Sequence, residues 1–302
     1  MLKTVTKTSA EDLLFNYNGI LYPSTVCWKE TLDALETFEA MDDDLLIVSY
    51  PKCGTNWVIQ IIYEMVSLTK NQETLLDQPV LEYGNPQLLQ KLKERPPPRI
   101  ISSYLPFQMI PKSFFKKKAK ILLVIRNPKD TAISYFNFYK TLPALPTYTS
   151  WNVFFTDFIH GNVCYGSYFD YVAEWNKHID EDNVMAVTFE DMKTDFPGQL
   201  KKISEFYRLP LTEEQICVIQ SRTSFTSMKD NSENTHGKFV MLSSEKVKRI
   251  LNYYFCFLTG QVGDWKSLFT EDQSKDVDEI FQQHLAGTKL GDLLNYTKYC
   301  KL

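Results

Sequence analysis

The segment YPKCGTNW, residues 50–57, has the residue types of an anion-binding turn. An apolar run precedes it and a segment with helical spacing follows it, so the free N–H groups and the positive dipole end of a helix would face the turn. Gly54 allows the backbone to approach an anion closely, Lys52 adds a positive charge, and Thr55 and Asn56 add a hydroxyl and an amide donor. The alternative is an ordinary tight turn with an incidental lysine.

A second candidate for anion binding lies in IRNPKDTAISYF, residues 125–136. Arg126 is expected at the end of an apolar run and Ser134 two turns into the following helix, and both could reach a second phosphate. Taken alone, Arg126 could equally be the partner of a surface ion pair. Trp57, just after the first turn, offers a flat face for an aromatic base. Because the lysine of the first turn precedes its glycine, unlike in a Walker A loop, hydrolysis of ATP or GTP is disfavoured.

Four short apolar runs, rich in β-branched residues, predict the buried strands that position these turns. Segments with helical spacing alternate with them. This alternation predicts an α/β fold of the doubly wound type, with a central parallel sheet flanked by helices. The predicted strands are residues 44–50, 98–105, 119–126 and 183–190, and the predicted helices are residues 56–68, 128–139, 167–179 and 196–207.

The composition limits the classes of function. A formal net charge of −4 gives no general attraction to nucleic acid or to anionic membranes, so any anion site must be local. The N-terminal sequence has no signal-peptide pattern, and no stretch approaches the roughly 20 apolar residues of a membrane span, so we expect a cytosolic protein. Six dispersed cysteines, without Cys-x-x-Cys pairs or histidines at zinc-ligand spacing, predict reduced thiols and no metal site.

The two turns together resemble those of the cytosolic sulfotransferases, whose loops read Tyr-Pro-Lys-Ser-Gly-Thr-Thr-Trp and Arg-Asn-Pro-Lys-Asp. Further segments are similar to family motifs in the same order: SSYLPFQMIP, TFEDMKTDFPGQLKKISEF, TSFTSMK and GDWKSLFT. The resemblance covers residues 12–299 and is nearest to vertebrate subfamily 6B. It implies a single domain over residues 1–302 with a P-loop-like sulfotransferase fold.

The resemblance also implies a donor, 3′-phosphoadenosine 5′-phosphosulfate (PAPS), and transfer of its sulfuryl group without a metal to a hydroxyl or amine of a small hydrophobic acceptor. Lys52 and the neighbouring N–H groups would stabilise charge on the bridging oxygen, as in phosphoryl transfer. Phe189 stands where the family usually has tyrosine. The implied contacts to the 5′-phosphosulfate and adenine are Lys52, Cys53, Gly54, Thr55, Asn56 and Trp57, those to the 3′-phosphate are Arg126 and Ser134, and those on the adenine side are Phe189, Thr223, Ser224, Phe225 and Met228.

The sequence departs from the family at its catalytic base, because Tyr104 replaces the histidine of Thr-His-Leu-Pro. Tyrosine, with a reference pKa near 10, accepts a proton poorly, and losing a general base typically slows a reaction by about 10² to 10⁴. A pKa of Tyr104 lowered by Lys52 and Arg126 would compensate in part. Ser102 also replaces a family lysine. None of the four histidines, His160, His178, His236 and His284, is an obvious substitute for this base. Only His236 is a candidate.

Two further departures lie near the C-terminus. Residues 238–259 do not resemble the family loop and are either a genuine insertion or retained intron sequence; at their end Leu258-Thr259-Gly260 replaces Arg-Lys-Gly, so Gly260 remains as a donor contact without the two cations. The family's dimer motif, residues 266–275, keeps Thr270 but gains charges, which favours a monomer or a weak homodimer. Beside the sulfotransferase, these losses leave a catalytically inactive sulfotransferase-like binding protein as an alternative. A third alternative is a P-loop nucleotide kinase or phosphatase of related architecture, which neither a Walker lysine nor a metal-binding carboxylate pair supports.

Overall fold

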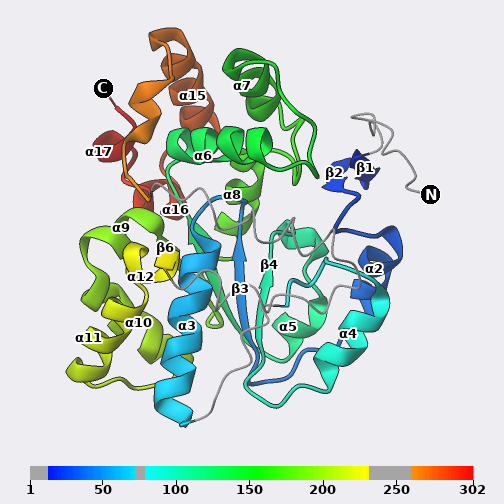
Figure 1. Cartoon of the computed structure of the whole chain (residues 1–302), viewed down its shortest axis with the longest axis vertical. Helices are drawn as coiled ribbons and strands as arrows, with labels where there is room; N and C mark the ends of the chain where they lie inside the picture. Colours follow the sequence, from blue (N-terminus) through cyan, green and yellow to red (C-terminus); the bar gives the residue numbers. More distant parts are fainter. Residues whose placement is uncertain (1–12, 72–78, 231–259, 302) are drawn as a thin grey trace.

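The centre of the molecule is a four-stranded parallel sheet with the strand order β4-β3-β5-β6 (Figure 1). The structure is a computed structural model, and it describes residues 13–71, 79–230 and 260–301. His236 and the atypical segment 238–259 lie outside these residues. The predicted strands are confirmed, each a little shorter than its apolar run: β3 (Leu45–Ser49), β4 (Ile100–Ser103), β5 (Lys120–Ile125) and β6 (Val184–Thr188).

Successive residues of the strands enter two different hydrophobic cores. Leu46 and Val48 pack into one core, whereas Leu45 and Ile47 pack into the other. Side chains alternate between the two faces of a strand, so this division shows that helices cover both faces of the sheet. The α/β architecture with a parallel sheet between helices is therefore confirmed.

The four predicted helices are also present, and further helices surround them (Figure 1). The helix α3 lies in front of the sheet, while α6, α7 and α15 lie beyond the carboxyl ends of the strands. A small antiparallel pair, β1 (Leu14–Tyr17) and β2 (Ile20–Pro23), stands apart from the sheet. The helices are α2 (Lys29–Ala34), α3 (Thr55–Lys70), α4 (Pro86–Lys93), α5 (Lys112–Lys116), α6 (Pro128–Thr141), α7 (Trp151–Ile159), α8 (Tyr168–Asn176), α9 (Phe189–Thr194), α10 (Phe196–Tyr207), α11 (Glu213–Arg222), α12 (Phe225–Asp230), α15 (Glu271–His284), α16 (Lys289–Leu293) and α17 (Tyr296–Cys300).

The strand register brings the candidate site to one edge of the sheet. Val48 of β3 is paired with Ser103 of β4, and Ser49 is paired with Val124 of β5. The turn after β3, Tyr104 after β4 and Arg126 after β5 therefore leave the sheet side by side at its carboxyl end, where open α/β sheets bind ligands.

A buried aspartate attaches the C-terminal segment to this edge. The Asp130 carboxylate, in the first turn of α6, accepts hydrogen bonds from the backbone N–H groups of Gly263 (2.8 Å) and Trp265 (2.9 Å). The described C-terminal residues from Gly260 onward are thereby held next to the start of α6.

Candidate active site

The turn between β3 and α3 leads directly into the N-terminus of the helix. Gly54, the N-cap residue of α3, has φ +99° and no side chain, so the N-cap residue itself does not cap the helix. Lys52 also has a positive φ, +71°, which is uncommon for a residue with a Cβ. The Thr55 hydroxyl forms a buried hydrogen bond with the Ser49 hydroxyl. A helix N-terminus could hold an anion through its N–H groups and its dipole.

Gly54 cannot carry a side chain without displacing its neighbour. A Cβ at this position would lie 2.7 Å from Cδ2 of Phe189, the first residue of α9. The Phe189 ring centroid lies 4.5 Å from the Arg126 guanidinium carbon and 5.6 Å from the Trp57 ring centroid. Phe189 thus links the two turns found in the sequence, although it begins a helix instead of ending a strand.

Arg126 lies beneath the turn and is almost completely buried. Its Nη1 donates to the Lys52 carbonyl (3.3 Å) and its Nη2 to the Gln261 carbonyl (2.9 Å), and Nη2 lies 3.9 Å from the Asp130 carboxylate. Its Nε is buried, and no hydrogen-bond partner for it occurs in the described part of the chain. Arg126 therefore has donor capacity left for a ligand, and the expectation of a surface ion pair is wrong for it.

Lys52 is a second cation at the same place. Its Nζ lies 4.4 Å from the ring centroid of Phe138 on α6, and no acidic side chain among the described residues forms an ion pair with it. Burial, with a smaller contribution from the Arg126 charge, lowers the pKa of Lys52 to about 8. Lys52 has no carboxylate partner among the described residues, and Arg126 beside it is only partly compensated, by Asp130 at 3.9 Å; such an arrangement of cations is typical of an anion site.

The structure brings most of the expected donor contacts together. Trp57 Nε1 donates to the carbonyl of Thr223, the residue that ends α11 (2.9 Å), and the Trp57 ring stacks against Phe196 at 6.1 Å. Asn56 lines the same cavity as Lys52, Gly54 and Thr55.

The remaining expected contacts have weaker structural support. Ser134 is half-buried on α6, Ser224 is exposed, and Met228 is half-buried on α12, where the Phe225 side chain is not described. Cys53 is buried, and burial raises the pKa of its thiol to about 12, so it is not a thiolate nucleophile.

Tyr104 follows β4 and lines a cavity at the end of the turn. Burial, followed by the negative charge of Glu82, raises the pKa of Tyr104, and a hydrogen bond with Thr55 opposes this only in part. The alternative in which Lys52 and Arg126 lower the pKa of Tyr104 is therefore wrong, because burial and the Glu82 carboxylate raise it. Ser102 donates to the Pro79 carbonyl (3.1 Å) and supplies no charge.

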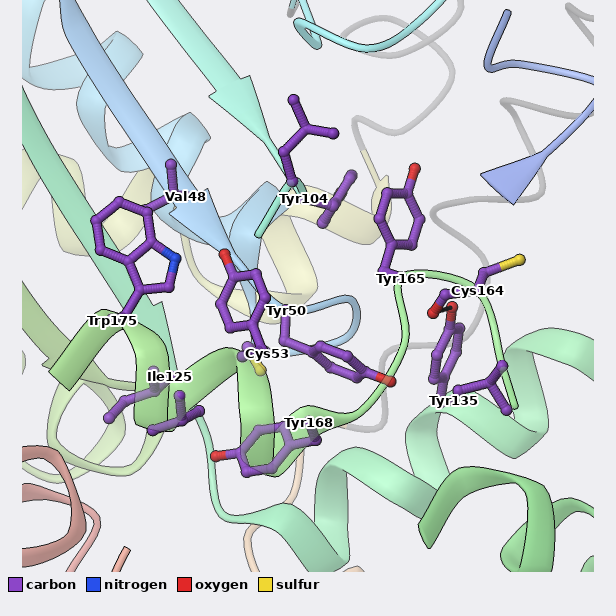
Figure 2. Close-up of a cluster of buried hydrophobic side chains, with 14 of the residues drawn as sticks. Val48, Tyr50, Cys53, Tyr104, Ile125, Tyr135, Cys164, Tyr165, Tyr168 and Trp175 are labelled. Atoms are coloured by element: carbon purple, nitrogen blue, oxygen red, sulfur yellow. Dashed lines mark hydrogen bonds between the residues drawn. The ribbon is translucent and has the colours of Figure 1, made fainter. Parts of the chain in front are cut away.

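Five of the thirteen residues that line the cavity beside Tyr104 carry aromatic rings. Figure 2 shows Tyr104, Tyr135, Cys164 and Tyr165 in this region; Tyr104 follows β4, Tyr135 lies on α6, and Cys164 and Tyr165 lie on the loop before α8. The described histidines do not line it. The complete lining is Pro23, Pro51, Lys52, Gly54, Thr55, Asn56, Tyr83, Tyr104, Tyr135, Phe138, Leu145, Cys164 and Tyr165.

Two residues that matter at this site, Glu82 and Tyr165, were not predicted from the sequence. Tyr165 lines the cavity, and Glu82 lies behind it with no exposed surface. The available signal for Glu82 was a single acidic residue in the apolar stretch PVLEYG. Tyr165 has no local signal of that kind.

Over the described ranges, no helix is both long enough and apolar enough to cross a membrane. The same residues contain no group of three or more His, Cys, Asp or Glu side chains that could hold a metal ion. The five described cysteines are free thiols.

Comparisons with known proteins agree with this geometry. Residues 42–289 match the model of the sulfotransferase domain. Sulfotransferase 6B1 of Mus musculus is 45% identical over 295 residues, covering 97% of this chain and 93% of the relative, and sulfotransferase 6B1 of Homo sapiens is 43% identical over 296 residues, covering 98% and 93%. The crystal structure of mouse sulfotransferase SULT7A1 complexed with PAP superposes with a TM-score of 0.80 at 32% identity, covering 96% of this chain and 100% of the other.

Proposed function

This chain belongs to the sulfotransferase family, and we propose that it transfers a sulfuryl group from PAPS to a hydroxyl or amine of a small hydrophobic acceptor. The observation that carries the proposal is the convergence of two cations, the half-buried Lys52 and the buried Arg126, at the N-terminus of α3. A solved relative complexed with PAP supports a nucleotide of this kind as the ligand.

The donor side of the site fits a nucleotide with two anionic groups. The N–H groups of the turn and Lys52 would bind the 5′-group, while the unused Nε of Arg126 and the Ser134 hydroxyl would bind the 3′-phosphate. Trp57 and Phe189 would contact the adenine with Thr223 beside them, and Ser224, Phe225, Met228 and Gly260 would complete the donor contacts.

When bound, PAPS supplies the sulfuryl group and a leaving oxygen that gains negative charge. Lys52 and the N–H groups of Gly54 and Thr55 are aligned before the reaction, so they would stabilise that charge without reorganising. Gly54 lets the backbone approach the anion closely, and the Phe189 ring packs where a side chain at this position would lie.

The acceptor would occupy the aromatic cavity. Its rings suit phenols, alcohols or amines with an apolar body, and Lys52 and Thr55 close the end that faces the donor. A cytosolic location and a monomeric or weakly dimeric state stay predictions. In the motif expected to dimerise, Thr270 caps α15, and the charged Glu271 and Lys275 lie in its first two turns.

The second candidate is a catalytically inactive binding protein, and Tyr104 at the family's histidine position is the observation that favours it. Two experiments separate the candidates. PAP is 3′-phosphoadenosine 5′-phosphate, the donor without its sulfuryl group. At about 100 times its Kd, PAP should stabilise the protein by about 2.7 kcal/mol, which corresponds to a rise in Tm of about 4 °C for a chain of this length. Transfer of radiolabelled sulfate from PAPS to simple phenols is then measured on the same preparation.

Each outcome decides between the readings. A rise with PAP together with phenol sulfation supports the enzyme, whereas a rise without sulfation of a broad panel of phenols, alcohols and amines supports the binding protein. The absence of any rise refutes the nucleotide site itself. Adenosine 5′-monophosphate is the control ligand, because it lacks the 3′-phosphate that Arg126 would bind and should raise the Tm less.

A further inference from the structure

Glu82 is a carboxylate enclosed by the wall of the acceptor cavity. It has no exposed surface; Oε1 accepts a hydrogen bond from the Tyr104 backbone N–H (2.8 Å) and Oε2 accepts one from the Ser103 hydroxyl (2.9 Å). The Tyr165 side chain also interacts with Glu82 and acts to lower the pKa of its carboxyl, and the Tyr165 hydroxyl lies 3.6 Å from Cys27 Sγ. An enclosed carboxylate with only neutral donors is unusual, because burial without a countercharge disfavours ionisation.

Within the described ranges, the groups around Glu82 supply no positive charge. No described Lys, Arg or His forms an ion pair with Glu82. The titratable side chains that face it are four tyrosines and one cysteine: Tyr22, Cys27, Tyr104, Tyr165 and Tyr171. Burial raises the pKa of Glu82 to about 7, although its hydrogen bonds act in the opposite direction. A base with a pKa near neutral pH accepts protons better than an ordinary surface carboxylate.

Tyr165 connects this carboxylate to the cavity. It lines the cavity together with Lys52 and Thr55, and its ring centroid lies 5.6 Å from that of Tyr104. Figure 2 shows the Tyr104 and Tyr165 side chains near one another, on the segment after β4 and on the loop before α8. A tyrosine hydroxyl can donate to Glu82 while it accepts a hydrogen bond from an acceptor hydroxyl.

We propose that Tyr165 and Glu82 form the proton relay of this sulfotransferase, with Tyr165 touching the acceptor hydroxyl and Glu82 receiving the proton through it. The inference rests on the proposed function. The acceptor O–H proton passes to Tyr165 Oη as the Tyr165 proton passes to the Glu82 carboxylate. The acceptor oxygen then forms its bond to sulfur, and the bond between sulfur and the bridging oxygen breaks with its electron pair leaving on PAP. Glu82 returns its proton to solvent after release.

Tyr104 is not placed for this relay, because its side chain is hydrogen-bonded with Thr55 and its hydrogen bond to Glu82 comes from the backbone N–H. Its backbone instead holds one carboxylate oxygen in place, as the Ser103 hydroxyl holds the other. The replacement of the family's histidine thus leaves a base in the wall of the same cavity.

The first test is Glu82→Gln, which keeps the shape and the oxygen acceptor but removes the base. We expect kcat/KM for phenol sulfation to fall by about 10² to 10⁴, and the acid limb of the wild-type pH profile, with an apparent pKa of about 7, to disappear. The defect should be larger with an unactivated phenol such as 4-methylphenol than with the more acidic 4-nitrophenol, which needs less help to ionise. A merely structural role of Glu82 would not produce this dependence on acceptor acidity.

Tyr165→Phe is the second variant and should show a comparable loss of kcat. Tyr22→Phe is the matched control: its hydroxyl is buried near the same carboxylate but has no hydrogen-bond partner among the described residues, so removing it should leave the profile unchanged. Wild-type rates and an intact acid limb in Glu82→Gln would overturn the relay. If that variant does not fold, an unchanged Tyr165→Phe profile overturns it equally.

The PAP-induced rise in Tm, measured together with wild-type activity, distinguishes failure of the proposed function from failure of the relay alone. Wild-type protein that binds PAP but sulfates no acceptor refutes the proposed function, and the relay with it. An active wild-type protein with equally active Glu82 and Tyr165 variants refutes the relay alone.

Discussion

Replacing Lys52 by methionine should stabilise the free protein while it weakens donor binding. Burial and Arg126 lower the pKa of Lys52 from 10.5 to about 8, and each pKa unit corresponds to about 1.36 kcal/mol, so the charged form is disfavoured in the fold by up to about 3.4 kcal/mol. Part of the side chain reaches solvent, which reduces the expected gain to about 1–3 kcal/mol. Methionine nearly keeps the length of the side chain and places an apolar end near the Phe138 ring, which the Lys52 Nζ approaches to 4.4 Å.

The pH dependence of this gain has a definite sign. Below about pH 8, Lys52 is protonated in both states, and the wild-type protein carries the full penalty. Between about pH 8 and 10.5 the unfolded chain binds more protons than the folded one, so the contribution of Lys52 to stability rises with pH and the advantage of the variant shrinks.

The assay is thermal unfolding at pH 7 and near pH 10, with and without PAP. Lys52→Met should raise the Tm of the free protein by about 2–5 °C at pH 7 and reduce the PAP-induced rise from about 4 °C to about 1 °C, since one charge-assisted contact is commonly worth about 1.5–3 kcal/mol. Lys112→Met, at an exposed lysine on α5, is the control and should change neither quantity. An unchanged or lower Tm of the free variant, or a full response to PAP, would refute the reasoning.

Two more variants test the two sides of the site. Gly54→Ala should destabilise the protein by about 1–3 kcal/mol and weaken PAP binding, because the new Cβ would lie 2.7 Å from the Phe189 ring and alanine disfavours a φ of +99°. Urea unfolding measures the change in stability, and an unchanged midpoint with normal PAP binding would contradict the prediction. Tyr104→His should restore phenol sulfation at about pH 7–8 in the Glu82→Gln background, because it reintroduces a base in the cavity wall; no recovery in a folded, PAP-binding double variant would count against that role.

The sheet could be predicted because its strands are buried on both faces and read as continuous apolar runs. The exact ends of the strands could not be predicted, because the last residues of an apolar run can cap and begin the following helix. The Thr188 hydroxyl accepts a hydrogen bond from the Asp191 N–H and starts α9, so Phe189 belongs to the helix although the run NVMAVTFE continues through it. Apolar periodicity does not register such a cap.

The donor turns were predictable because each is local in sequence: a strand end, a few polar residues and a helix start. The acceptor wall was not. Glu82 and Tyr165 lie outside the regular strands and helices, and single bridges, Val80 with Ser102 and Leu21 with Cys164, attach their segments. The direction of the Tyr104 pKa shift was also not predictable, because burial and the Glu82 carboxylate raise this pKa and neither is visible in the sequence.

The two sides of the site carry uncompensated charges of opposite sign. Lys52 on the donor side has a lowered pKa, and Glu82 behind the acceptor cavity has a raised one, and the two form no ion pair with each other. Pairing them would relieve both penalties and would also remove the cation needed by a leaving oxygen and the base needed by an acceptor hydroxyl. Each charge therefore costs stability in the free protein and becomes useful only with ligands on both sides. A scaffold that merely enclosed a hydrophobic ligand would need neither charge, so this separation favours transfer over binding alone.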